Sequence, residues 1–187
     1  VALSRHPDFL NGSRPAYAPD PGNVTTLRRA ALWHPTSRYR HFALGSGEEA
    51  ASLRIDEMSC PVFLQVFGTL CTTSHAATVS AGPDAVFEDR LPRAFSRGIL
   101  VVKSYVDRGS SLAIIDRFRG KWRIVAETPP IGQPNRWLNP AAVADFQGDR
   151  HPRIALVKTP HLDGVLQVWR WGTNPRTRRT FLELEHE

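Results

Sequence analysis

The side chains best suited to chemistry in this sequence lie in the segment "DFQGDRHPR", which begins at Asp145. Oxygen-bearing side chains at alternate positions, here Asp145, Gln147 and Asp149, are typical of loops that bind Ca²⁺, a cation that takes roughly six to eight oxygen ligands. Such a loop also needs a glycine for its sharp turn and a closing acidic residue, but Arg150 and Arg153 stand at those places. A guanidinium group removes an oxygen and repels the ion. The sequence therefore predicts a degenerate calcium loop that is retained as a turn without a metal or other cofactor, with Asp149 paired to Arg150 or Arg153. The minor alternative is that the loop still binds calcium.

Other reactive side chains lack the spacing that catalysis requires. Ser74 and His75 are neighbours, but a Ser-His-Asp site depends on geometry that adjacency does not supply, and no Gly-x-Ser-x-Gly motif is present. Glu88 and Asp89 would point to opposite faces of a strand, which does not suit a shared acid-base pair. The histidines show no zinc-binding spacing. The sequence predicts that this protein is not an enzyme.

Cys60 and Cys71 flank a segment that reads as a strand followed by a turn. In an oxidising compartment the two could form a disulfide, whereas in a reducing compartment they would be small buried apolar groups. Their wide spacing does not favour a metal or redox site. The sequence leaves both states of this pair open.

The elements that carry these residues read as strands throughout. Short runs rich in β-branched and aromatic residues are separated by Gly, Pro, Asp and Ser, which predicts an all-β fold. The predicted strands cover residues 53–55, 62–67, 77–79, 99–102, 112–115, 122–126, 154–157 and 166–171. The best helical candidate, "GEEAAS" at residues 47–52, is only about one turn long and reads equally well as a polar loop. We also expect a positive φ at Gly164, in the Asp-Gly turn of "HLDGVL", and we expect Trp169 and Trp171 to share a packed face of one strand.

Two parts of the predicted β region resemble each other. When "ILVVKSYVDRGSSLAIIDRF" is aligned with "RIALVKTPHLDGVLQVWRW", Lys103 falls opposite Lys158 and Leu112 falls opposite Leu166, and a fainter copy starts at "YRHFALGSGEEAASLRID". Repeats of this size favour stacked or radially arranged four-stranded sheets. The predicted boundaries are an extended Pro-rich arm with a first strand at residues 1–36 and a repeat domain at residues 37–187, with units at residues 37–82, 86–132 and 136–187.

The segment "NPAAVADFQGDRHPRIALVKTPHLDGVLQVWRW" resembles the FG-GAP and VCBS repeat proteins, whose pattern ADxDGDGxxD precedes a strand, a loop and another strand. "VFEDRLPR" and "TPPIGQPNRWLNPAAVADF" are similar to bacterial exported proteins that carry this repeat. The resemblance covers residues 39–171 and is strongest in residues 86–171. It implies a β-propeller or partial propeller built from four-stranded antiparallel sheets, in a family used mostly for binding.

The net charge of +6 and the pI near 10.0 favour acidic protein surfaces or other anionic surfaces as partners. No aromatic-basic motif of an RNA-binding sheet is present, so we expect no specific nucleic-acid partner, and no apolar run reaches the ~20 residues of a transmembrane helix. The predicted partner-contact residues are Phe9, Tyr17, Arg176, Arg178 and Arg179.

So few repeat units would leave an apolar face or a strand edge open, which soluble proteins rarely do. We therefore predict a non-catalytic scaffold or accessory subunit whose main partners are other protein subunits of a complex. The alternative is an exported VCBS-repeat module that binds carbohydrate or a surface protein. Since the first residue is Val rather than Met, we expect processing during export to the periplasm or exterior, or during import into an organelle such as the mitochondrion.

Overall fold

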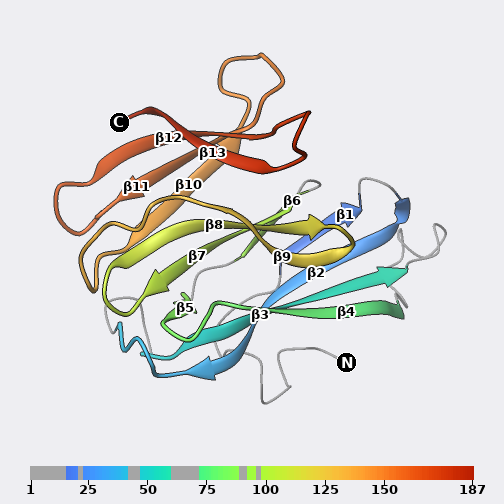
Figure 1. The fold of residues 1–187 in the computed structure, drawn as a ribbon, viewed down its shortest axis with the longest axis horizontal. Coiled ribbons are helices and arrows are strands. Elements are labelled where there is room, and N and C mark those ends of the chain that lie inside the picture. Colours follow the sequence, from blue (N-terminus) through green and yellow to red (C-terminus); the bar gives the residue numbers. More distant parts are fainter. Residues whose placement is uncertain (1–15, 21–22, 42–46, 60–71, 89–91, 96–97) are drawn as a thin grey trace.

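A computed structural model describes residues 16–20, 23–41, 47–59, 72–88, 92–95 and 98–187 of this protein (Figure 1). These residues form thirteen strands and, within those ranges, no helix. The strands pair antiparallel in a nine-stranded and a four-stranded sheet, and neither sheet closes on itself in the described part of the chain. The prediction of an all-β fold is confirmed.

The strands follow one another as three antiparallel meanders. The first consists of β1 (Ala16–Asp20), β2 (Asn23–Thr36), β3 (Glu49–Ser59) and β4 (Thr72–Ser80). The second consists of β5 (Ala85–Phe87) and β6 (Arg93–Phe95), which both pair with β7 (Gly98–Tyr105), followed by β8 (Gly109–Phe118) and β9 (Lys121–Glu127). The third consists of β10 (Leu138–Ala144), β11 (Arg153–Lys158), β12 (Val165–Thr173) and β13 (Thr180–His186). One bridge, Ala50 to Phe87, joins the first two meanders into the nine-stranded sheet.

The second meander is the middle layer of the molecule, with β10–β13 above it and β2–β4 below it in Figure 1. Ile99 and Val101 of β7 pack with the first meander, whereas Leu100 and Val102 pack with the third. Burial on both faces explains why β7 and β8 are continuous apolar runs rather than alternating ones. Burying one such side chain stabilises the fold by about 1.5–3 kcal/mol, so this layer is the centre of the core.

Most of the sequence-predicted strands lie within observed ones. The segments at residues 53–55, 77–79, 99–102, 112–115, 122–126, 154–157 and 166–171 fall in β3, β4, β7, β8, β9, β11 and β12, respectively. Trp169 and Trp171 pack in the core between β7–β8 and β10–β12, as predicted. The predicted strand at residues 62–67 and both cysteines lie outside the described residues.

The helical candidate at residues 47–52 is wrong. Glu49 begins β3, and Ala50 is fully buried and pairs with Phe87. The pattern "GEEAAS" has good helix formers, but the adjoining residues of β3 contribute Leu53 and Ile55 to the core. Tertiary packing therefore overrides the local helix propensity of this short segment.

Candidate interface for an acidic partner

A tight turn joins β8 to β9 and concentrates positive charge. Arg119 and Gly120 have φ angles of 52° and 79°. Two consecutive residues with positive φ are typical of a type I′ turn, whose twist matches that of the flanking strands. The segment "RGKWR" thereby places Arg119, Lys121 and Arg123 around the hairpin end, and all three side chains are exposed.

A second turn joins β12 to β13 and is organised by Asn174. The Asn174 side-chain oxygen accepts hydrogen bonds from the backbone N–H groups of Arg176 at 3.0 Å and Thr177 at 3.1 Å. The Asn174 backbone N–H donates to the Arg179 carbonyl at 2.9 Å, and the Arg178 N–H donates to the Asn174 carbonyl at 2.8 Å. These bonds fix the backbone while the three arginine side chains remain exposed.

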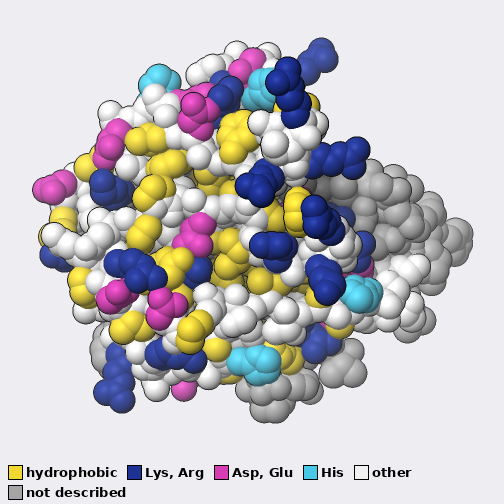
Figure 2. All heavy atoms as spheres, viewed as in Figure 1, with side chains coloured by type: hydrophobic (Ala, Val, Ile, Leu, Met, Phe, Trp, Pro, Cys, Tyr) yellow, Lys and Arg dark blue, Asp and Glu magenta, His cyan; other side chains and the backbone are white. Residues whose placement is uncertain are grey.

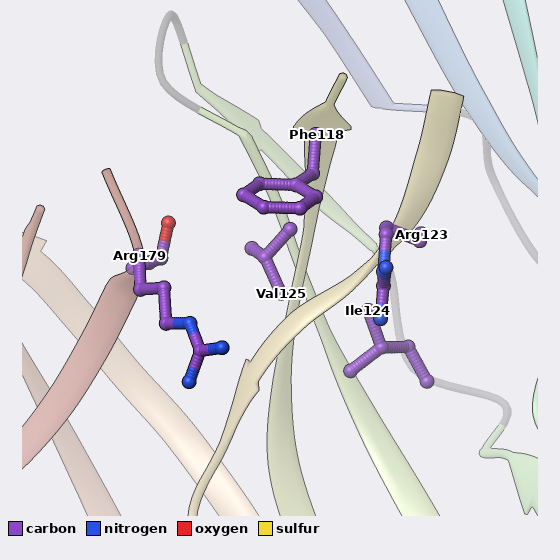
Figure 3. A pocket seen from close by; sticks show the side chains of 6 residues that line it. Phe118, Arg123, Ile124, Val125 and Arg179 are labelled. Atoms are coloured by element: carbon purple, nitrogen blue, oxygen red, sulfur yellow. The ribbon is translucent and has the colours of Figure 1, made fainter. Parts of the chain in front are cut away.

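Between these hairpins, where β9 and β13 approach each other, lies a groove of about 380 Å³. Its lining residues are Phe118, Arg123, Ile124, Val125, Arg179 and Thr180 (Figure 3). In Figure 3 the Phe118 ring and the Val125 side chain lie between the arginines at 123 and 179. We call this groove, together with the cations of the two turns, the basic groove.

The cations of the basic groove differ from several arginines elsewhere in the described structure, which form ion pairs. Arg29 and Arg54 each contact Asp56 at 2.9 Å, and Arg117 contacts Glu57 at 2.6 Å. No ion pair among the described residues involves the six cations of the two turns, Arg119, Lys121, Arg123, Arg176, Arg178 and Arg179. Figure 2 shows Lys and Arg side chains gathered where β9 and the β12–β13 turn lie in Figure 1.

At the groove, two arginines contact an aromatic ring and no carboxylate of the described residues. The guanidinium groups of Arg119 and Arg123 lie 5.4 and 5.5 Å from the centroid of the Phe118 ring. Such cation–π contacts orient an arginine without neutralising its charge. The groove can therefore offer oriented guanidinium groups to carboxylates and an apolar surface to the residues between them.

The structure brings together residues that lie far apart in the sequence. Three of the predicted contact residues, Arg176, Arg178 and Arg179, belong to the basic groove, and their contact with a partner stays a prediction. The cations of the β8–β9 turn were missed, although the alternating "RFRGKWR" around a glycine was the signal that could have found them. Tyr17 lies in β1, opposite Arg29, and Phe9 lies outside the described residues.

The loop at residues 145–153, which the sequence predicts to be a degenerate calcium loop, contains an internal cation. The Arg153 guanidinium donates hydrogen bonds to both carboxylate oxygens of Asp149, at 2.7 and 2.8 Å, and to the Gln147 side-chain oxygen at 2.8 Å. A further bond of 2.7 Å joins Arg153 to Glu185 of β13. Of the two arginines that the sequence offers to Asp149, Arg153 forms the pair.

The other carboxylate of this loop, that of Asp145, is also occupied within the chain. Asp145 accepts hydrogen bonds from the backbone N–H groups of Asp149 at 3.1 Å and Arg150 at 2.7 Å. The Arg153 guanidinium holds the pKa of the Asp149 carboxyl well below its usual range. Within the described residues, no group of three or more His, Cys, Asp or Glu side chains is arranged to hold a metal ion.

A buried polar cluster, unforeseen from the sequence, links the β2–β3 connection to the middle layer. The Ser104 and Ser110 hydroxyls both donate to Glu88, the latter at 3.1 Å, and the His41 ring nitrogen Nδ1 lies 3.4 Å from the same oxygen. Burial, with the nearby Glu88 charge, raises the pKa of Tyr39 to about 12. His41 lies against Glu88 rather than against a serine hydroxyl in these contacts, which is not the arrangement of a Ser-His nucleophile pair. Through Glu88, the cluster connects the β2–β3 connection with β7 and β8.

The serine and histidine that are neighbours in the sequence do not form a reactive pair either. Ser74 and His75 are exposed on β4, and the Ser74 hydroxyl donates to the Glu57 backbone carbonyl at 3.0 Å. Asp89, the neighbour of Glu88, lies outside the described residues.

No family model, curated protein or solved structure matches the chain. Among the residues that the structure describes, no helix is long and apolar enough to cross a membrane. In the basic groove, cations without ion pairs among the described residues coincide with an accessible hollow. The groove is therefore the feature from which a function is inferred.

Proposed function

We propose that this protein is a non-catalytic scaffold or accessory subunit that binds an acidic segment of a partner protein in the basic groove. The observation that carries the proposal is that Arg123 and Arg179, which line the groove, and the other four cations of the two turns form no ion pair within the described residues, whereas arginines such as Arg29 and Arg117 are paired with carboxylates. Like charges held close together repel one another, and an acidic partner would relieve that repulsion. Charge complementarity of this kind also speeds association and selects among partners.

The lining of the groove specifies the chemistry of this segment. Arg123 and Arg179 stand on either side of Phe118 and Val125 (Figure 3). A segment that alternates acidic and apolar residues can place carboxylates against the guanidinium groups and its apolar side chains on this floor. Guanidinium groups bind carboxylates through paired hydrogen bonds, which gives geometric selectivity as well as attraction.

The proposed architecture is a partial β-propeller in which each meander is one blade. The face-to-face stacking of the meanders supports this interpretation, because the middle meander is covered on both faces by its neighbours. Blades of four-stranded sheet around a common axis pack in this way. As a scaffold, the protein would use the rim between the second and third blades for the acidic segment.

The test is a binding titration with a fluorescein-labelled Glu-rich peptide that carries Leu at intervals, and with a Lys-rich peptide of the same design. We expect the wild-type chain to bind only the acidic peptide, with an affinity that falls as salt is added. The double variant Arg123→Glu, Arg179→Glu should weaken binding by about tenfold or more, equivalent to about 1.4 kcal/mol. A partner that wild-type protein retains from its source and the double variant loses would then identify the assembly.

Arg40→Glu is the matched control, because Arg40 is exposed but lies in the β2–β3 connection. It makes half the charge change of the double variant without altering the groove. Equal affinity of wild-type and double-variant protein, equal loss in both variants, or binding of the Lys-rich peptide would overturn the proposal.

A further inference from the structure

The β7–β8 and β11–β12 hairpins pair in equivalent registers. The cross-strand pair Leu100 and Ile114 corresponds to Ala155 and Val168 when the first strand is shifted by 55 residues and the second by 54. Under the same shifts, the pair Val102 and Leu112 corresponds to Val157 and Leu166. The hairpins therefore direct equivalent positions to equivalent faces of their sheets.

One of these faces is buried in the middle layer and open in the third meander. Leu100, Val102, Leu112 and Ile114 are only 2%, 1%, 0% and 0% exposed, because β10–β13 covers them. In the third meander, Ile154 and Leu156 face back toward that layer. The residues next to Ile154 and Leu156 in β11 point away from the middle layer and form the outer face of this meander. Leu166 of β12 lies on this outer face and is 56% exposed. The side chains of Ala155, Val157 and Val168 on the same face are partly exposed.

We infer that the outer face of β10–β13, centred on Val157, Leu166 and Val168, docks a further four-stranded antiparallel sheet of the same repeat. The docking sheet would contact this face with apolar side chains at the positions equivalent to Ile154 and Trp169, which contact the middle layer. The inference rests on the proposed function as a module of a larger assembly, and it names the partner of a surface other than the basic groove. It continues an interface that the molecule already contains, one layer further out.

The charges at the edge of this face favour an apolar occupant. Arg153 is paired with Glu185, and Arg170 is paired with Glu183, so these outward arginines are neutralised within the sheet. A face with an apolar centre and internally paired charges suits another sheet face better than an acidic peptide.

The register also predicts the size of the partner's side chains. Ala155 stands where the middle layer has Leu100, and Val168 stands where it has Ile114. Because packed sheets fill the space between them, the docking sheet must present larger side chains opposite Ala155 than β10–β13 presents to Leu100. A second copy of this chain cannot offer the Ile154 face of its third meander to this site, because that face is already buried against the second copy's own middle layer. The occupant is therefore a sheet from another stretch of polypeptide.

The test fuses the full chain, through a Gly-Ser linker after Glu187, to a second copy of residues 136–187 as a probe sheet. We expect the probe sheet to dock on the outer face, so that it resists proteolysis and raises the melting temperature of the fusion by several degrees. The linker makes docking intramolecular and compensates for the imperfect fit at Ala155.

Val157→Asp in the first copy should abolish both effects, since it places a carboxylate in the centre of the interface. It should leave the first copy folded, as judged by circular dichroism, because Val157 is partly exposed there. The control Val106→Asp changes an exposed valine of the β7–β8 turn and should leave docking intact. A probe sheet that stays protease-sensitive, or that is insensitive to Val157→Asp, overturns the inference. Binding of the acidic peptide to the same fusions reports separately on the basic groove.

Discussion

In the β10–β11 loop, a guanidinium group makes the contacts that a calcium loop reserves for its metal. Arg153 binds the side chains of Gln147 and Asp149 from within the chain. Its own side chain is only 4% exposed, whereas that of Asp149 is 40% exposed. The loop is thus closed by a cation that belongs to the chain itself. The same residue ties the loop to β13 through Glu185.

Replacing this cation should weaken the fold in a pH-dependent way. We expect Arg153→Met to lower the melting temperature by several degrees at neutral pH, since two carboxylates lose a charged hydrogen-bond donor. The Asp149 pKa is lowered in the folded state, so its pairing adds stability above the ordinary Asp pKa of about 3.9, and this stability is lost as the pH falls below that value. The difference between wild-type and variant in thermal unfolding should therefore shrink on acidification.

Arg150→Met provides the control for this change, because it removes the same charge from an exposed position in the same loop. It should cause little change in melting temperature. Equal losses for the two variants, or a difference that persists unchanged at low pH, would contradict the assigned role of Arg153.

At the level of elements, the turns set where the strands meet, and two glycines show how differently turns are constrained. Gly164 has a φ of 65°, as predicted, and an added Cβ would meet no atom within 4 Å. Gly109 has a φ of 74° at the start of β8, and an added Cβ would collide with the backbone oxygen of Gln133 and lie 2.8 Å from that of Arg136. The second turn is therefore held by packing as well as by conformation.

This contrast predicts the effect of alanine at the two turns. Gly164→Ala should lower the free energy of unfolding by about 1 kcal/mol, the approximate cost of a left-handed conformation for a residue with a Cβ. Gly109→Ala should cost at least twice as much, because the Cβ must also displace the connection between β9 and β10. Urea denaturation of both variants measures the difference. Equal losses would show that the connection yields without cost.

For the whole molecule, stability is concentrated in the layer that has neighbours on both faces. Leu112 in β8 is fully buried between the second and third meanders, while Leu166 occupies the equivalent position in β12 and is 56% exposed. Equivalent positions in similar hairpins therefore have different energetic roles. The order of the layers, rather than the local sequence, determines that difference.

The same substitution at these two positions should therefore change the free energy of unfolding by different amounts. We expect Leu112→Ala to lower the free energy of unfolding by about 3 kcal/mol, the range for a buried leucine that leaves a cavity. Leu166→Ala should change it by less than about 0.5 kcal/mol, as is usual for exposed sites. Denaturant unfolding of the isolated chain provides the measurement. A large loss for Leu166→Ala would mean that the outer face is already covered.

The sequence alone determined the features that depend on neighbouring residues. Runs such as "ILVV" predicted the strands of an all-β fold, because strand geometry follows from local apolar pattern and turn residues. The Asp-Gly turn predicted the backbone conformation of Gly164, and the placement of Arg153 limited the partners of Asp149 to two. The propeller, the disulfide and the partner contacts stay predictions.

Only the tertiary structure decided which distant residues meet. Arg123 and Arg179 lie on one groove because β9 packs beside β13, and no local pattern encodes that contact. The burial of Glu88 depends in the same way on residues distant in the sequence, because His41 and Ser104 contact it from other parts of the chain. Local periodicity sets the two faces of a strand, but the sheet that packs on each face is chosen by the energy of burying both surfaces together. That choice left Leu112 enclosed and Leu166 exposed.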